Sequence, residues 1–535
     1  MTDGASPVLI VGAGPTGLTA AVELSRLGVP VRIIDRAAQP ATTSRALAVQ
    51  ARTLELLHPR GAGAEMLRLG NKARSTALHA RGRKLATVEL HRMPSRFNHV
   101  LLLPQSETER LLRELLHRQG VRVERGVELL SCEQSDGGVR AVLRKPGGAA
   151  ETVRAGQLIA ADGAHSGVRH ALGLPFDGAS LPQRYLLSDL HVDGDLPSDQ
   201  LSVFLAADGF VAVFPLSGGR FRLMATDPRP HAADRATPGL AELQGICDHV
   251  LPTPVRLRDA RWSSRFRINS RHLATLRSGA IFFGGDAAHV HSPAGGQGMN
   301  TGIQDMINLA WKLAMVRRGQ AAPELLDTYQ TDRLPVIRAL VRSTETATRI
   351  LNSTNPVLHQ AFSRIAPIAL GTTAVQDKAA AVLGEVAASY RDSPIAAGGG
   401  GIGRLRAGDR VPDADVLPVS GGVAGRESER LHELLDLGRF TLVVCDPAAD
   451  PAALAERFRP WSEVLIVRQV AVPADQPALR GTDSAIVRDL AARPGLLLVR
   501  PDGYLAAAAR GTGPERLAGW LRGWLTPVRE RPAVG

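Results

Sequence analysis

The chain has 535 residues, 44% of them hydrophobic, and a formal net charge of +12, so we expect about two to four globular domains. Acidic residues lie between the arginines and aromatic residues make up only 4% of the chain, which argues against a nucleic-acid-binding surface. A solvated positive surface is the better interpretation, and its field would help to attract an anionic cofactor.

The N-terminus and the cysteines bear on location. No basic segment precedes the first apolar strand, and no apolar run reaches the ~18 residues that a membrane span needs. Cys132, Cys247 and Cys445 form neither a CxxC motif nor a metal-ligand spacing. We therefore expect a cytoplasmic protein with no membrane association, no metal site and no disulfide framework.

Residues 8–35 predict a dinucleotide-binding unit. A strand at 8–11 is followed by Gly12-Ala13-Gly14-Pro15-Thr16-Gly17, then by a helix and by a strand at 31–34 that ends at Asp35. Gly12 would allow the tight turn, Gly14 would let the main chain approach a pyrophosphate, and Gly17 would let helix and strand pack closely. Asp35 stands where a carboxylate can hold ribose hydroxyl groups.

Two helices are expected next. One covers 51–57, with Arg45 in the loop ahead of it, and an amphipathic helix begins near Gln105 with Ser106 as its N-cap. Arg45 could reach cofactor phosphates or the substrate entrance, and a surface ion pair is the alternative. Strands at 121–130 and 139–144 should form a hairpin.

Two buried strands end in an aspartate beside a glycine. The strand near 158 leads to Asp162-Gly163, and the strand at 280–284 leads to Gly285-Asp286. Because a carboxylate at a buried edge needs partners, both aspartates are candidate ligand contacts, although Asp–Gly pairs are also ordinary turns.

Residues 175–270 predict a largely antiparallel sheet inserted between the nucleotide-binding parts. Its strands are expected at 186–192, 201–206, 210–216 and 220–226. Four phenylalanines of this region would line an apolar pocket or simply fill the core. They are Phe204, Phe210, Phe214 and Phe221.

The stretch 279–315 predicts a site for negative charge. A glycine-rich loop containing Pro293 leads into a helix whose apolar face carries Met299, Ile303, Met306, Ala310 and Leu313. The first N–H groups of a helix lack partners and its dipole is positive there, so an anionic group is favoured at this end.

The C-terminal third is expected to begin with helical segments, at 324–350 and onward to about 392. The run Gly398–Gly403 also fits GxGxxG, but it follows no strand and opens no helix, so a flexible junction is predicted. Beyond it we expect strands at 440–445, 463–468 and 496–499 and helices at 427–436, 451–458 and 514–524. This α/β alternation is similar to thioredoxin, but Cys445 stands alone, which excludes dithiol chemistry.

Three motifs in order resemble the single-component FAD-dependent aromatic hydroxylases, the group A flavoprotein monooxygenases. They are GxGxxG at 12–17, AADGAHSGVR at 160–169 and GDAAHVHSPAGGQGMN at 285–300. The resemblance covers the whole chain and favours the phenol-hydroxylase branch with its aromatic polyketide hydroxylases.

The resemblance implies an α/β fold class with three domains. They are a Rossmann-like, glutathione-reductase-like FAD-binding domain (1–72, 97–176 and 268–395), an inserted antiparallel substrate domain (73–96 and 177–267) and, after a junction at 396–403, a thioredoxin-like domain without CxxC (404–535).

The motifs also imply site residues. Asp286 would bind the ribityl chain of FAD, and the main chain of Gly298, Met299 and Asn300 would stabilise the negative charge of reduced flavin. The full set of implied FAD contacts is Gly12, Gly14, Pro15, Thr16, Gly17, Asp35, Arg36, Arg45, Gln105, Asp162, Gly163, Gly285, Asp286, Pro293, Gly295, Gly296, Gly298, Met299 and Asn300. The candidate substrate contacts are Leu47, Phe204, Phe214 and Pro293.

The implied reaction uses NADPH or NADH to reduce FAD and O₂ to form a C4a-hydroperoxyflavin, which hydroxylates a polycyclic aromatic phenol or quinone of the polyketide type. Baeyer–Villiger oxygenation or epoxidation by the same flavin peroxide is the alternative chemistry. A catalytically inactive flavin- or ligand-binding protein is the alternative outside the enzymes, and a homodimer is compatible with each.

One position departs from the family pattern. Phenol-hydroxylase-like members place an acid in the loop before the RTLE helix, whereas this chain has Leu47 there. No catalytic side-chain base is therefore assigned, and a phenol acidified by a conjugated quinone would not need one. His289 and His291 are open to either a substrate contact or a structural role.

Overall fold

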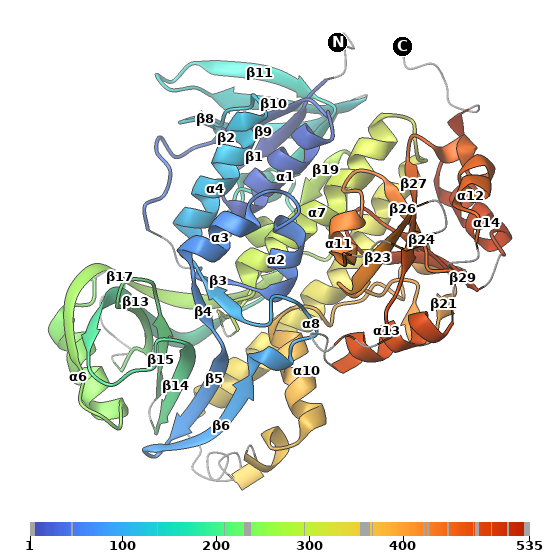
Figure 1. Ribbon diagram of the computed structural model, residues 1–535. Coiled ribbons are helices and arrows are strands. Elements are labelled where there is room, and N and C mark those ends of the chain that lie inside the picture. The colour runs from blue at the N-terminus through green and yellow to red at the C-terminus, as the bar shows by residue number, and fades with distance from the viewer. Residues whose placement is uncertain are drawn as a thin grey trace.

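The computed structural model describes residues 6–43, 46–135, 137–207, 209–228, 237–293, 295–353, 364–365, 367–420, 423–424, 427–446, 449–474, 476, 481–493, 495–510 and 513–528. Arg45 lies outside these residues. Within them, no helix is long and apolar enough to cross a lipid bilayer. Figure 1 shows a mixed α/β molecule built around three sheet-centred parts.

A six-stranded sheet in the order β18-β19-β12-β1-β2-β8 forms the first part and is parallel except for the β18–β19 pair. The first helix, α1 (Pro15–Arg26), packs against α4 (Gln105–Arg118) and α7 (Gly298–Arg317). All four residues of β1 are buried, as expected for a strand covered on both faces. The strands are β1 (Val8–Val11), β2 (Val31–Asp35), β8 (Glu124–Arg125), β12 (Gln157–Ala160), β18 (Arg277–Ser278) and β19 (Ile281–Phe283).

Smaller elements complete this part. The predicted hairpin is confirmed, but the predicted strand at 121–130 is wrong in extent, because Gly126 at φ +70° separates β8 from β9. The predicted N-cap at Ser106 is also wrong, since α4 begins at Gln105 and Ser106 lies in its first turn. The elements are β3 (Ala48–Val49), α2 (Ala51–Leu57), α3 (Gly63–Leu69), β4 (Asn71–Ala73), β7 (Val100–Leu102), β9 (Glu128–Ser135), β10 (Gly138–Arg144), β11 (Ala150–Ala155) and α5 (Gly167–Ala171).

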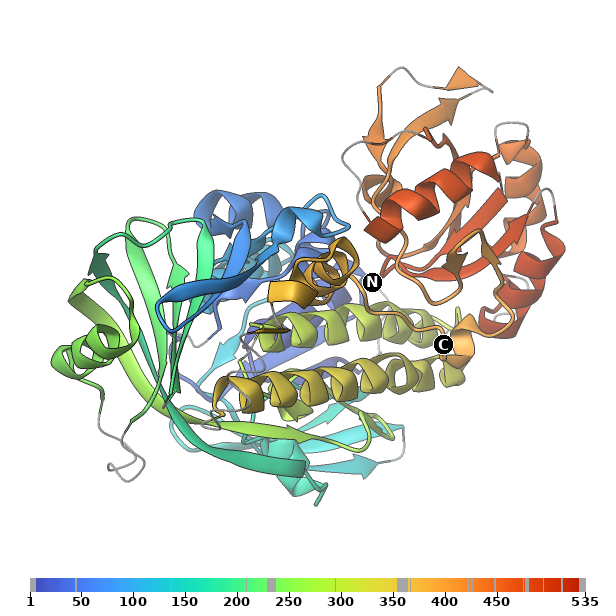
Figure 2. The same ribbon diagram turned by 90° about the horizontal axis from the view of Figure 1, so that it is seen from below.

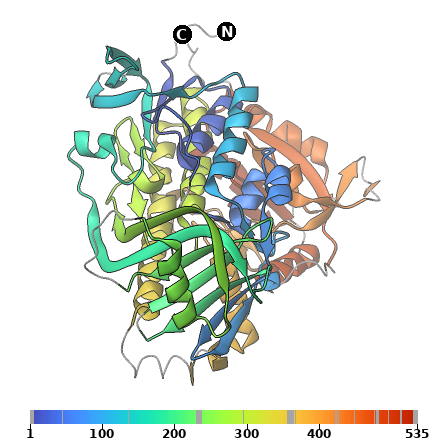
Figure 3. The ribbon, with the colours of Figure 1, turned by 90° about the vertical axis from the view of Figure 1, so that its left-hand side faces the viewer.

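The second part is an eight-stranded sheet in the order β20-β17-β13-β16-β15-β14-β5-β6, antiparallel except for the β14–β5 pair. Figure 3 shows its strands side by side. One face is covered by α6 (Leu240–Val250), whose Leu243 and Cys247 share a core with Phe204 and Phe221. The strands are β5 (Ser75–Ala80), β6 (Arg83–Glu89), β13 (Asp177–Asp193), β14 (Gln200–Ala206), β15 (Gly209–Pro215), β16 (Arg220–Thr226), β17 (Arg256–His272) and β20 (His289–Val290).

Two long helices connect the parts. Figure 2 shows α7 and α8 (Asp327–Leu351) side by side, with α10 (Thr373–Leu383) following along the chain. The apolar face predicted for α7 is confirmed, because Ile303, Met306 and Leu313 are fully buried.

The third part is a seven-stranded sheet in which β23, β27, β26, β28 and β29 lie in that order, with β24 and β25 both paired to β23. The predicted helix at 427–436 is wrong, because Glu429–Arg430 pair with β23 and only Leu431–Leu434 are helical. The strands are β23 (Asp415–Ser420), β24 (Val423–Ala424), β25 (Glu429–Arg430), β26 (Phe440–Val444), β27 (Leu465–Ala471), β28 (Gly495–Val499) and β29 (Leu505–Arg510). The helices are α11 (Leu431–Leu434), α12 (Pro451–Arg457), α13 (Gly481–Ala492) and α14 (Glu515–Trp524).

The glycine run before this part is not a free linker, contrary to the prediction. β21 (Gly401–Ile402) pairs with β22 (Leu405–Arg406), and the N–H of Ala508 donates to the carbonyl oxygen of Gly399 at 2.7 Å. The run is therefore tied to β29 by main-chain hydrogen bonds.

Candidate active site

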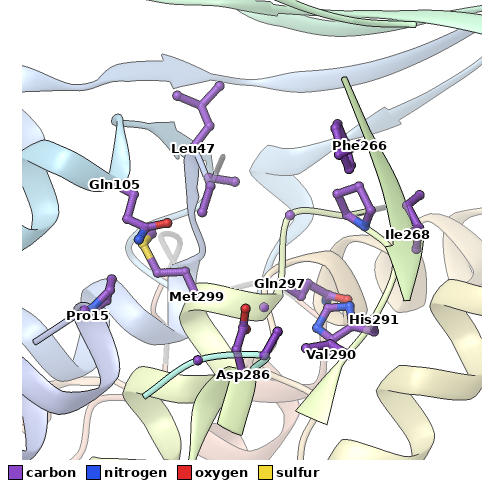
Figure 4. Close-up of a pocket in the computed structure, with 18 of the residues that line it drawn as sticks. Pro15, Leu47, Gln105, Phe266, Ile268, Asp286, Val290, His291, Gln297 and Met299 are labelled. Atoms are coloured by element: carbon purple, nitrogen blue, oxygen red, sulfur yellow. The ribbon is translucent and has the colours of Figure 1, made fainter. Parts of the chain in front are cut away.

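A cavity of about 390 Å³ lies where the parallel sheet meets the inner face of the eight-stranded sheet. Figure 4 shows Leu47 and Gln105 on one side of it, Phe266 and Ile268 on the other, and Asp286 below. The cavity is lined by Gly14, Pro15, Thr16, Ala46, Leu47, Ala48, Gln105, Ala161, Gly163, Ala164, Leu187, Phe214, Arg222, Met224, Phe266, Arg267, Ile268, Asn269, Asp286, Val290, His291, Pro293, Gly296, Gln297, Gly298 and Met299.

The three motif glycines of residues 12–17 have different surroundings. A Cβ at Gly12, where φ is +101°, would collide with Ala161, and a Cβ at Gly17 would collide with the carbonyl oxygen of Gly12. A Cβ at Gly14 would meet no atom within 4 Å. Gly12 and Gly17 therefore serve the turn and the helix–strand packing, whereas Gly14 leaves open space at the cavity.

Asp35 lies beside the glycine loop but not on the cavity. Its carboxylate accepts hydrogen bonds from the N–H of Ala13 at 2.7 Å and of Ala37 at 2.8 Å, and Arg125 approaches it at 3.4 Å. Through these hydrogen bonds Asp35 stabilises the glycine loop at 12–17. Arg36 is exposed and does not line the cavity either.

Asp162 presents a buried oxygen without a partner. Its Oδ2 accepts from the N–H of Val168 at 3.2 Å, whereas Oδ1 has no hydrogen-bond partner among the described residues. Gly163, at φ +83°, follows on the cavity wall. A buried carboxylate oxygen without a donor is uncommon in a folded protein, which favours a ligand donor at this place.

Asp286 is brought to the cavity by close packing at the start of α7. The segment Gly285–Ala287 is a 3₁₀ turn, with Gly285 at φ +56°. A Cβ at Gly285 or at Gly302 would collide with the hydroxyl oxygen of Thr16. The starts of α1 and α7 therefore meet at Asp286, which is exposed to the cavity.

The first turn of α7 is fixed by Asn300. Its side chain donates to the carbonyl oxygens of Ala48 and Gly296, both at 2.9 Å, and accepts from the N–H of Gln50 at 2.9 Å. Asn300 is fully buried and does not line the cavity, so its side chain clamps the loops around it. The first helical hydrogen bond of α7 runs from the N–H of Thr301 to the carbonyl oxygen of Gln297. The N–H groups of Gly298, Met299 and Asn300 precede this bond, as is usual for the first turn of a helix.

His289 and His291 have different partners and different positions relative to the cavity. His289 is buried and binds Asp305 at 2.8 Å, and Asp305 also binds Arg333 at 2.8 Å and the N–H of Gly285 at 3.1 Å. Burial raises the pKa of Asp305, but Arg333 and His289 outweigh it and hold this pKa below its ordinary value. His289 is therefore a structural residue that supports the turn before Asp286.

His291 lines the cavity. Burial, and then His289, lower the pKa of His291 to about 4, so its imidazole is neutral at physiological pH. Its Nδ1 contacts the carbonyl oxygen of Ser292 at 2.8 Å, which makes Nδ1 the protonated nitrogen and Nε2 an acceptor.

The opposite wall of the cavity is the inner face of the eight-stranded sheet. Arg222 is buried in this wall and makes a two-pronged ion pair with Asp189 at 2.6 and 2.8 Å. Apolar side chains surround it. They are Leu187, Phe214, Met224, Phe266 and Ile268.

Three of the four candidate substrate contacts line the cavity and one does not. Leu47, Phe214 and Pro293 line the cavity. Phe204 does not, because it belongs to the core under α6 and stacks on His79 with ring centroids 4.5 Å apart. The substrate role predicted for Phe204 is therefore not supported.

Several lining residues were missed from the sequence. Arg222, Phe266 and Ile268 lie on strands β16 and β17, and β17 itself was not predicted. Alternation along 220–226 identified β16, but nothing in one sequence tells which face of a strand meets a cavity. Among the described residues, no three His, Cys, Asp or Glu side chains converge on a metal site.

The residues fit a flavin dinucleotide. Gly14 with its open space and Gly298 and Met299 at the start of α7 line one cavity, and Asp162 lies in the chain between two lining residues, Ala161 and Gly163. The Oδ1 of Asp162 has no hydrogen-bond partner among the described residues. These groups suit a pyrophosphate, an anionic ring edge and a hydroxyl group. His291 supplies a polar group beside Gly298, and Arg222 supplies one on the opposite sheet wall.

Comparison with known proteins supports the same cofactor. Residues 5–344 match the family model described as FAD binding domain, and residues 405–527 match the one described as aromatic-ring hydroxylase, C-terminal. The chain is 39% identical to "6-methylpretetramide 4-monooxygenase" of Streptomyces rimosus, over 99% of this chain and 95% of that protein. It is 32% identical to "Pentachlorophenol 4-monooxygenase" of Sphingobium chlorophenolicum, over 94% and 93% of the two chains.

Solved structures are similar along their whole length. "OxyS anhydrotetracycline hydroxylase from Streptomyces rimosus" aligns with a TM-score of 0.78 at 29% identity, covering 98% of this chain and 100% of that one. A ternary complex of aklavinone-11 hydroxylase with FAD and aklavinone aligns with a TM-score of 0.72 at 25% identity, covering 98% and 99%. The chain therefore belongs to the family of FAD-dependent aromatic-ring hydroxylases, and it is a flavoprotein monooxygenase.

Proposed function

We propose that this enzyme uses NADPH or NADH and O₂ to hydroxylate a polycyclic aromatic phenol or quinone of the polyketide type. The observation that carries the proposal is the single cavity that joins the flavin-binding segments to an apolar sheet wall. The relatives support the substrate class, since they are named for 6-methylpretetramide, anhydrotetracycline and aklavinone.

The FAD-binding roles follow from the placement of each group. Gly14 would receive the pyrophosphate, Asp162 a hydroxyl group and Asp286 the ribityl chain. The N–H groups of Gly298 and Met299 would stabilise the negative charge of the reduced ring system, because the α7 dipole is positive at that end. FAD supplies the electron transfer and the oxygen activation when it is bound.

The sheet wall would position the substrate. Phe214, Phe266 and Ile268 offer a flat apolar surface to fused rings and exclude water, while Arg222 presents a guanidinium to a ring hydroxyl group. A positive charge there would favour the phenolate, which reacts faster with an electrophilic oxygen. With Leu47 in place of an acid, this electrostatic effect substitutes for a side-chain base.

We also propose finer assignments for the fold and its setting. The six-stranded sheet with α1 would be a Rossmann-like unit of the glutathione-reductase type, and the part beyond residue 404 would be thioredoxin-like in fold without dithiol chemistry. Burial raises the pKa of Cys445 to about 12, which supports an inert thiol there. A cytoplasmic setting is consistent with the unpaired cysteines.

The test is aerobic turnover of the FAD-loaded enzyme with NADPH or NADH and a panel of anthraquinone- and naphthacene-type phenols. We expect substrate-dependent oxidation of the nicotinamide and a product that carries one oxygen atom from ¹⁸O₂. Nuclear magnetic resonance of the product then separates a hydroxyl group from an ester or an epoxide. A purified protein without flavin, or flavin that NAD(P)H never reduces in the presence of any panel member, would contradict the proposal.

A variant series tests the electrostatic step. Arg222→Gln should raise the pKa of a bound phenol, read from the absorbance of the phenolate in the non-turnover complex, while Arg256→Gln on the exposed start of β17 should leave it unchanged. A pH–rate profile whose pKa stays fixed when substrates of different acidity are compared would instead indicate a side-chain base.

A further inference from the structure

A second cavity, of about 490 Å³, lies in the C-terminal part and shares no lining residue with the first. It is formed where β21 and α14 both pack on β29, which Figure 1 shows next to one another. Its charged lining residues are three arginines, Arg406, Arg510 and Arg516, and the other four are glycines and alanines.

The glycine run at 398–403 explains how two of these arginines come together. A Cβ at Gly400, where φ is +71°, would collide with Nη1 of Arg516. A Cβ at Gly401 would lie 2.9 Å from Cδ and 3.0 Å from Nη1 of Arg406. The absence of side chains at 400 and 401 therefore lets both arginine side chains lie against the same stretch of main chain.

The carboxylates nearby are engaged elsewhere. Asp409 accepts from the main-chain N–H of Arg406 at 2.9 Å, and its carboxylate pairs with Arg391 at 2.6 and 2.8 Å. Glu515, at the start of α14, pairs with Arg457 through Oε1 at 2.8 Å, and its Oε2 lies 3.9 Å from a Cβ built on Gly513 of the cavity lining. Within the described ranges, none of the three guanidinium groups has a carboxylate partner; that of Arg406 donates to the carbonyl oxygens of Gly403 and Leu405.

Arg406, Arg510 and Arg516 are exposed, so solvent screens the repulsion between their like charges, and an anion bound between them would replace it by attraction. Guanidinium groups offer paired donors that match phosphate oxygens, and a cavity of this size holds more than a single phosphate. We infer that the C-terminal part carries a second binding site, for a phosphorylated small molecule with two or more negative charges, held by Arg406, Arg510 and Arg516.

Pyrophosphate and ADP are the probes for this site. Calorimetric titration uses the full-length protein saturated with FAD, so that the flavin site cannot bind the probe. The unmodified protein should bind pyrophosphate, and Arg510→Gln/Arg516→Gln should weaken binding at least about tenfold, because each lost charge-assisted hydrogen bond to phosphate weakens the complex strongly.

The matched control removes the same charge from the same part of the chain. Arg468 and Arg493 are exposed and do not line the cavity, so Arg468→Gln/Arg493→Gln should bind pyrophosphate as the unmodified protein does. Equal weakening in both double variants would mean a general charge effect, and no binding by the unmodified protein would mean no site. Either result would overturn the inference.

A second measurement does not depend on folding of a variant. Phenylglyoxal modifies accessible arginines, and mass spectrometry locates the products. Pyrophosphate should protect Arg406, Arg510 and Arg516 but not Arg468. Modification of all four at the same rate with and without pyrophosphate would overturn the inference, as would protection by an oligonucleotide and not by pyrophosphate.

Discussion

The two ends of α7 use polar residues in opposite ways. Its first turn places Gly298 and Met299 on the cavity, and the neutral side chain of Asn300 beside them binds the neighbouring loops. Its later turns carry Lys312, which is fully buried and bound to Asp332 of α8 at 2.7 Å. Arg500, from the C-terminal part, binds the same Asp332 oxygen at 2.7 Å and pairs with Asp502 at 2.5 Å.

The difference shows how to separate a structural polar cluster from a binding site. At the later turns two cations face two anions, and none of the four lines either cavity described above, so the charges are compensated within the protein. Beside the first turn, the cavity-lining His291 has an Nε2 that lacks a hydrogen-bond partner among the described residues. Uncompensated polar atoms beside a cavity, rather than charge as such, indicate the ligand.

The largest loss of stability is expected from breaking the buried ion-pair cluster of Lys312, Asp332, Arg500 and Asp502. Asp332→Ala leaves Lys312 and Arg500 facing each other without their shared anion, and should lower the free energy of unfolding by about 3–5 kcal/mol. Asp327→Ala on the same helix removes a largely exposed partner of Arg277 and should cost at most about 1 kcal/mol. Denaturant unfolding of both variants measures the contrast, and equal losses would contradict it.

Breaking the contacts of the first turn of α7 should lower the free energy of unfolding less, but it should damage the cofactor site more. Asn300→Ala removes three hydrogen bonds between α7 and the loops at 48–50 and 296, which should cost about 2–3 kcal/mol of unfolding free energy. The loosened loops should also release FAD faster, which flavin fluorescence follows. An unchanged release rate would show that the clamp does not shape the site.

The second turn of α7 supplies a pH test. Gln304 donates to Glu385, and burial raises the pKa of Glu385 from 4.5 to about 8, against the opposing effect of Arg333. A carboxyl group with a raised pKa in the folded state favours folding fully below pH 4.5, and this contribution is lost as the pH rises to about 8.

Glu385→Gln keeps the shape and the neutral state, so it should raise the Tm at pH 9 and change it little at pH 4.5. Thermal unfolding across this range measures the effect. A Tm difference between the variant and the unmodified protein that stays constant with pH would contradict the assignment.

The smallest effect on stability is expected at Gly14, directly before α1, the helix that packs on α7. Its φ of −77° suits alanine and a Cβ would meet no atom, so Gly14→Ala should leave the Tm of the apoprotein nearly unchanged. The Cβ would occupy space proposed for the pyrophosphate, so FAD affinity should fall about tenfold. Gly17→Ala is the control, since its Cβ collides with Gly12 in the protein itself and should destabilise the apoprotein too.

Local pattern predicted the nucleotide-binding elements well. The strand, glycine loop and helix at 8–26 and the glycine loop before α7 follow from short stretches whose residues contact one another. The glycine run at 398–403 has the same GxGxxG spacing, and only its lack of a flanking strand and helix distinguished it. The structure adds that arginine side chains lie against two of its glycines, Gly400 and Gly401.

Long-range partners could not be predicted. Strand β17 carries six arginines within 17 residues, which concealed its strand character, although Arg265 pairs with Asp227 and Glu242 in the folded sheet. Asp332 and Arg500 are 168 residues apart, and no spacing rule connects them. The helix predicted at 427–436 failed because pairing with β23 decided the conformation of Glu429–Arg430.

The order of strands in the parallel sheet has a consequence for synthesis of the chain. β1 pairs with β12, and β12 pairs with β19, so the sheet that carries the glycine loop is complete only once residue 283 has left the ribosome. At roughly 5–20 residues per second this takes on the order of 15–60 s. Lys312 and Asp332 form one ion pair of the buried cluster, and Arg500 with Asp502, near the end of the chain, adds the second. A nascent chain therefore lacks a complete flavin-binding sheet for about half of its synthesis, and the buried cluster gains its second ion pair only when residues 500–502 are made.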